Sequence, residues 1–104
     1  MAKIFRINPD YDCPPIWDEY AADYLEPSDL PLTASLISRM NAWQAEFDAL
    51  LDTEDGRRSG FKSKSARVKF DLRGMRLARF LQTELGAEYE VYYRNQPVRE
   101  MVVV

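Results

Sequence analysis

The sequence predicts an α+β fold in which two amphipathic helices pack on a small two- to three-stranded sheet, with a proline-rich N-terminal arm. Three observations lead to this prediction. Apolar residues recur with helical spacing over 34–52 and 66–85, apolar and polar residues alternate over 3–7 and 88–94, and five of the six prolines precede residue 32. With 104 residues the chain has the length of one domain, which we expect to span residues 1–104.

The N-terminal third combines a short strand with an irregular arm. Residues 3–7 predict a strand with Phe5 and Ile7 on one face. Over 8–32 the prolines exclude a long regular element, but the stretch is rich in aromatic residues. We therefore expect an ordered arm that wraps the core, with room for one helical turn at 18–24.

The first helix is expected at 34–52. Seven of its apolar side chains fall within roughly 140° of a helical wheel: Leu36, Ile37, Met40, Trp43, Phe47, Leu50 and Leu51. Thr33 is placed to be the N-cap, and Gly56 could end the helix in the left-handed conformation.

A basic loop at 56–65 separates this helix from the second one, expected at 66–85 and closed by Gly86. Gly74 lies in the middle of its apolar face, where a missing side chain permits close packing. The two apolar stripes predict a shared core, made of Trp43, Phe47, Phe70, Leu77 and Leu81.

The C-terminal part predicts two further strands. Residues 88–94 alternate as a strand, 95–97 resemble a turn, and the β-branched stretch 98–104 is expected to be a last strand with Pro97 at the sheet edge. An unprotected terminal strand could pair with a second copy, so a homodimer and a monomer are both open alternatives.

The composition argues against an enzyme and against bound cofactors or metals. The chain has no histidine and one cysteine, Cys13, which removes histidine-based nucleophilic sites, imidazole ligands and a disulfide framework. The glycine-containing loop 56–63 lacks the lysine spacing of a phosphate loop, and 52–56 lacks the spacing of a calcium loop. Carboxylate pairs such as Asp48 and Asp52 fit a solvated helix face. We expect no catalytic, cofactor-binding or metal-binding residue.

Charge is divided unevenly along the chain. Residues 1–55 hold three basic and twelve acidic side chains, and residues 56–104 hold eleven basic and five acidic ones. One interpretation is that the two halves fold against each other and neutralise their charges. The other is that each half forms part of an interaction surface.

The favoured function is protein binding by the arm, where aromatic side chains alternate with carboxylates. Such a surface suits a basic partner, because rings anchor an interface and charges steer association. The candidate residues are Asp12, Trp17, Asp18, Glu19, Tyr20, Asp23 and Tyr24. Alternatively, the aromatic residues only fasten the arm to the core.

The alternative function is nucleic-acid binding by the basic segment 57–79, since clustered lysine and arginine neutralise phosphates. The candidate residues are Arg57, Arg58, Lys62, Lys64, Lys69, Arg73, Arg76 and Arg79. A sequence pI near 4.9 and the acidic first half argue against it, because both repel a polyanion. No membrane partner is expected, and the absence of a signal-peptide pattern favours the cytoplasm.

Several short segments also resemble a family of small bacterial single-domain proteins without an assigned enzymatic activity. The matching segments are Ile16-Trp17-Asp18, Asp29-Leu30-Pro31-Leu32-Thr33, Trp43, Phe47-Asp48, Ser59-Gly60-Phe61, Leu77-Ala78 and Glu84-Leu85-Gly86. Some proteins of this kind are similar to the immunity partners of bacterial toxins, small acidic domains that bind a toxin surface. The resemblance implies a protein partner and transfers no catalytic residue.

Overall fold

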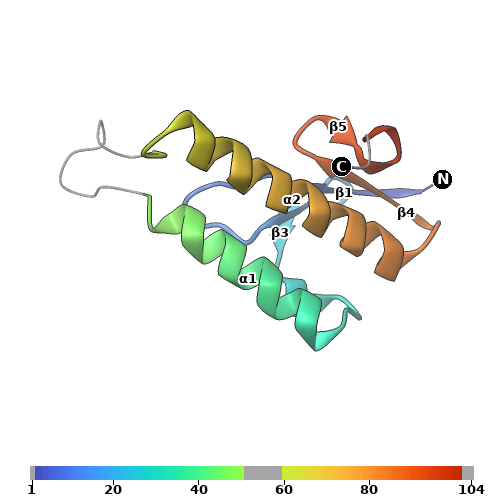
Figure 1. The fold of residues 1–104 in the computed structure, drawn as a ribbon. Coiled ribbons are helices and arrows are strands. Elements are labelled where there is room, and N and C mark those ends of the chain that lie inside the picture. Colours follow the sequence, from blue (N-terminus) through green and yellow to red (C-terminus); the bar gives the residue numbers. More distant parts are fainter. Residues whose placement is uncertain (1, 51–59, 102–104) are drawn as a thin grey trace.

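The computed structural model describes residues 2–50 and 60–101 (Figure 1). It contains a sheet and two helices that lie on the same side of it, so the α+β class is confirmed. The elements follow in the order β1 (Lys3–Ile7), β2 (Ile16–Asp18), β3 (Asp23–Leu25), the 3-10 turn η1 (Pro27–Asp29), α1 (Ala34–Asp48), α2 (Lys64–Leu85), β4 (Tyr89–Tyr93), β5 (Gln96–Pro97) and the 3-10 turn η3 (Val98–Glu100).

The sheet has five strands in the order β3-β2-β1-β4-β5, so the expectation of two to three strands was wrong. The two central strands, β1 and β4, are parallel, and all other neighbours are antiparallel. The three additional strands contain only two or three residues each. Strands this short leave too little alternation for a sequence pattern to predict them.

Two of those strands lie within the segment that was expected to be an irregular arm. Residues 8–32 form the β2–β3 hairpin and η1, and the helical turn expected at 18–24 is absent from them. Prolines favour extended backbone in the residues before them, and Pro14 and Pro15 directly precede β2. The prolines are therefore compatible with a short strand that begins directly after them.

Both helices begin and end at residues that satisfy their backbone. The Thr33 side chain accepts a hydrogen bond from the Leu36 amide, as expected for an N-cap, and Ser63 does the same for Ala66. Helix α1 ends at Asp48 instead of residue 52, and the Gly56 stop lies outside the described residues. Helix α2 begins at Lys64, within the expected loop, and ends at Leu85, with Gly86 as its C-cap at a φ of 85°.

The core lies between the helices and one face of the sheet. The Trp43 and Phe70 rings stack with centroids 4.4 Å apart, and the Trp43 Nε1–H donates to the Phe70 carbonyl at 3.1 Å. Leu77 and Leu81 are buried beside them, whereas Phe47 is only partly buried and packs against the core. The predicted core is therefore confirmed, with Phe47 at its rim.

Gly74 is the point of closest approach in this core. A Cβ atom added there would lie 2.6 Å from Trp43 Cζ2 and would also meet the Tyr93 ring. The missing side chain therefore admits two aromatic rings rather than the backbone of the other helix.

The expectation of a strand at 98–104 was wrong for residues 98–101, which the structure describes. Val98–Glu100 form a 3-10 turn, and residues 102–104 lie outside the described part of the chain. A 3-10 turn aligns residues three apart, and Val98 and Met101 accordingly both pack against the core. Strand pairing between two copies therefore has no strand to use at 98–101.

β5 pairs only with Tyr92 and Tyr93, and the earlier residues of β4 are covered by a side chain instead. The Gln82 side chain of α2 accepts from the Val91 amide at 2.8 Å and donates to the Tyr89 carbonyl at 2.8 Å. A side-chain amide thus occupies the backbone groups that a further strand would use.

Candidate protein-binding surfaces

The face of the sheet turned away from α1 and α2 carries one row of large side chains. The strand register places Tyr24 beside Trp17, Trp17 beside Arg6, and Arg6 beside Tyr92. All four side chains are partly exposed, whereas the chain neighbours of Arg6 and Tyr92, on the helix-covered face, are buried. The row joins β3, β2, β1 and β4 into one continuous surface.

Contacts within the row hold its side chains in place. The Trp17 and Tyr24 rings meet edge to face with centroids 4.9 Å apart. The Arg6 guanidinium lies 4.9 Å from the centre of the Tyr92 ring, and its Nε donates to Glu19 Oε1 at 2.8 Å. Such pairs add modest stability and fix side-chain orientation. The aromatic row is therefore preorganised for contact.

The β2–β3 turn projects Tyr20 from the end of this surface. Tyr20 is 88% exposed. Asp18 Oδ1 accepts from the backbone amides of Tyr20 and Ala21, at 2.9 and 3.1 Å, and Ala22 adopts a φ of 54° to close the turn. The turn has defined hydrogen bonds, so Tyr20 stands on an ordered support.

Six of the seven residues expected to bind a partner are gathered on this hairpin: Trp17, Asp18, Glu19, Tyr20, Asp23 and Tyr24. The structure adds Arg6 and Tyr92, which the sequence analysis missed. The sequence pattern that could have identified them is the alternation of apolar and polar residues in β1 and β4, because Arg6 and Tyr92 each lie between two buried residues. We call these eight residues the hairpin surface.

The seventh expected residue, Asp12, belongs to a neighbouring hollow of about 330 Å³ that Cys13, Glu26 and Asp48 also line. Its backbone amide donates to Asp48 Oδ1 at 2.9 Å. Tyr24 lies next to this hollow: burial, followed by a hydrogen bond with Cys13, raises the pKa of its phenol.

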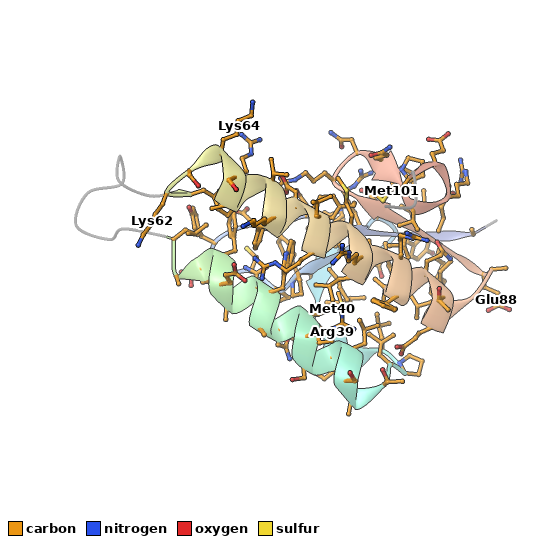
Figure 2. All side chains as sticks on the ribbon, in the orientation of Figure 1. Arg39, Met40, Lys62, Lys64, Glu88 and Met101 are labelled. Carbon is orange, nitrogen blue, oxygen red and sulfur yellow. The ribbon has the colours of Figure 1, made fainter. Side chains whose placement is uncertain are left out.

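A second surface lies between the two helices. A groove of about 350 Å³ runs between α1 and α2 and is lined by Arg39, Trp43, Glu46, Arg73, Arg76 and Leu77, together with Ala42. A smaller hollow of about 260 Å³ adjoins it and shares Arg76. In Figure 2, Arg39 is labelled on α1 near the middle of the molecule.

Among the described residues, one ion pair neutralises part of this groove. Arg73 donates two hydrogen bonds to the Glu46 carboxylate, both at 2.6 Å. These bonds lower the pKa of Glu46, although partial burial opposes them, and they raise the pKa of Arg73. The pair links the acidic half of the chain to the basic half, in agreement with the interpretation that the halves neutralise each other at this point.

The residues expected to form a basic surface are spread along α2. Lys62 and Lys64 lie at its start (Figure 2), Lys69, Arg73, Arg76 and Arg79 follow along it, and Arg57 and Arg58 lie outside the described residues. The structure brings Arg73 and Arg76 together at the groove, and Arg76 and Arg79 at the adjoining hollow.

Residues 2–50 and 60–101 contain neither a candidate metal-binding cluster nor a membrane-spanning helix. No group of three or more cysteine, aspartate or glutamate side chains there is arranged to hold a metal ion. No helix in the same part of the chain has the length and apolar character needed to cross a membrane.

Comparison with known proteins agrees with the resemblance noted in the sequence. No curated protein matches the chain. A family model described as Serratia CdiI immunity protein-like matches residues 3–96, which include both helices, the hairpin surface and the groove. The chain belongs to the Serratia CdiI immunity protein-like family.

Proposed function

We propose that this chain is an immunity protein that neutralises a toxic protein by binding to it in the cytoplasm, without catalysing a reaction. The observation that carries the proposal is the family match over residues 3–96. Binding alone can neutralise a partner if it covers the surface that the partner needs, so the proposal requires an interface and no active site.

The hairpin surface is the interface we propose. It combines tryptophan, tyrosine and arginine, the residue types that contribute most to binding energy at protein interfaces. The Trp17, Tyr24 and Tyr92 side chains are already held by neighbouring contacts, which reduces the entropy lost on binding.

The proposed partner is basic at the point of contact. Asp18, Glu19 and Asp23 lie within three residues of the exposed Tyr20 in the β2–β3 hairpin, and Glu19 has Arg6 as its ion-pair partner. A carboxylate-rich rim speeds association with a basic surface and disfavours acidic partners. Tyr20 would be the central anchor of such an interface.

Site-specific crosslinking tests this function. A photoreactive benzoylphenylalanine replaces Tyr20 in one variant and Val68 in the other. Val68 lies on α2 and is 47% exposed, so the second variant is the matched control. After irradiation in nuclease-treated lysate, we expect a protein adduct at position 20 and not at position 68. The captured protein, expressed alone, should stop growth, and co-expression of this chain should restore it.

The outcomes separate the alternatives. A captured protein that is harmless when expressed alone would overturn the immunity function. An adduct that forms equally at both positions would overturn the hairpin surface as the interface. Recovery of nucleic acid without nuclease treatment, lost at moderate salt, would instead favour the basic segment 57–79.

A further inference from the structure

The groove between α1 and α2 carries positive charge that the described residues do not neutralise. Arg39, Arg76 and Arg79 have no ion-pair partner within residues 2–50 and 60–101, whereas Arg73 is paired with Glu46. Arg39 and Arg76 line the groove, and Arg76 and Arg79 line the adjoining hollow. Three guanidinium groups without an ion-pair partner among the described residues therefore line the groove and the hollow that adjoins it.

An apolar side chain lies among these arginines. Phe80 is 45% exposed and lines the smaller hollow, and the Arg39 guanidinium lies 4.8 Å from the centre of its ring. The sides of Trp43 and Leu77 contribute to the larger groove. The groove and the hollow are thus lined by both apolar side chains and planar cationic donors, a combination suited to carboxylates carried on a peptide.

From these observations we infer that the groove binds a short acidic peptide segment of a partner protein, on a surface distinct from the hairpin surface. Guanidinium groups of Arg39, Arg76 and Arg79 would hold its carboxylates, and Phe80 would contact an apolar side chain. The inference does not depend on toxin neutralisation, since it concerns different residues and the opposite charge.

Two carboxylates limit the length and the chemistry of the occupant. Glu46 pairs with Arg73 in the groove, and Glu84, four residues beyond Phe80 on α2, accepts two hydrogen bonds from Thr33. Residues 73 and 84 are about 16 Å apart along α2, which an extended segment of about five residues spans. A continuous phosphate backbone would pass both carboxylates and be repelled by them. A short acidic peptide is therefore favoured over nucleic acid.

A titration with defined probes tests the inference. The probe is the capped peptide Glu-Glu-Leu-Glu-Glu, and its control is Gln-Gln-Leu-Gln-Gln. Added to the isotopically labelled chain, the acidic peptide should cause saturable amide shifts at Arg39, Arg76 and Phe80 and none at Tyr20. The glutamine peptide should cause none at these positions.

Matched variants show whether the groove is responsible. Arg76→Gln with Arg79→Gln should weaken binding of the acidic peptide by about tenfold or more, because charge-assisted hydrogen bonds are lost. Lys62→Gln with Lys64→Gln removes the same charge at the start of α2 (Figure 2) and should change binding by less than about twofold. A thermal melt of each variant checks that it is folded.

Several results would overturn the inference. One is the absence of saturable shifts at the groove in the intact chain. Equal losses in the two double variants would mean that general charge attraction, and not the groove, holds the peptide. Tighter binding of a short oligothymidylate through Arg76 and Arg79 would assign the surface to nucleic acid instead.

Discussion

The two faces of the sheet use the same strands for different purposes. On the covered face, Ile7 and Val91 are fully buried and Tyr93 is 2% exposed. On the opposite face, Arg6 and Tyr92 come from the same two strands and remain partly exposed. Alternation along a strand thus separates residues that hold the fold from residues available to a partner.

The contacts on the two faces differ as much as the exposure. On the covered face the Trp43 ring stacks on Phe70, meets Tyr93 at 6.2 Å and donates a hydrogen bond. On the other face Trp17 and Tyr24 contact each other, and Tyr92 contacts Arg6. Substitutions should therefore affect stability on the covered face and binding on the open one.

The largest effect is expected from Trp43→Ala. Loss of the stacked ring and its hydrogen bond should lower the free energy of unfolding by about 3–5 kcal/mol. Urea denaturation measures it, with Val68→Ala on the exposed side of α2 as the control. A loss below about 1 kcal/mol would show that the covered face does not hold the fold.

Gly74→Ala tests how closely the aromatic rings of the covered face pack against the backbone of α2. The new methyl group would overlap the Trp43 and Tyr93 rings, so we expect a loss of about 1–3 kcal/mol. In an unobstructed helix this substitution stabilises by about 1 kcal/mol. The sign of the change, measured by urea or thermal denaturation, therefore decides whether the rings pack against position 74.

Tyr93→Phe isolates one hydrogen bond of the covered face. The Tyr93 hydroxyl donates to Asp71 Oδ1 at 2.6 Å, and its removal should cost about 1–2 kcal/mol at neutral pH. Burial, and next the hydrogen bond to Asp71, raise the pKa of the phenol above its ordinary value. Because the folded state binds this proton more tightly, the stabilisation is complete below about pH 10 and is lost as the pH rises further.

Denaturation of both proteins between pH 9 and 11 measures this dependence. The difference in stability between the natural chain and Tyr93→Phe should shrink toward the alkaline end. A difference that stays constant or grows would contradict the assigned hydrogen bond.

The sequence predicts the covered face much better than the open one. Helical spacing identifies Trp43, Phe70 and Leu81 as core, and the cap at Thr33 follows from its position before the apolar stripe. These features depend on residues close together in the chain, and periodicity reports them directly.

The pairing of the strands depends on contacts between distant residues. Arg6 is opposite Tyr92 only because β1 and β4 are parallel neighbours, and no local pattern fixes this pairing. The hairpin strands are equally hard to predict from the sequence, since Trp17 and Tyr24 each lie in a three-residue strand among prolines. The chemistry of the hairpin was therefore predictable, and its inclusion in the sheet was not.

The most direct test of the difference between the faces compares two exposed side chains, Tyr20 on the hairpin and Val68 on α2. Affinity for the crosslinked partner is measured by calorimetric titration, and stability by urea denaturation, for Tyr20→Ala and Val68→Ala. We expect Tyr20→Ala to weaken binding by about thirtyfold, as at an interface anchor, with a stability change below about 0.5 kcal/mol. Val68→Ala should change neither quantity appreciably. Binding by Tyr20→Ala within about twofold of the natural chain would contradict the assignment of the open face to the partner.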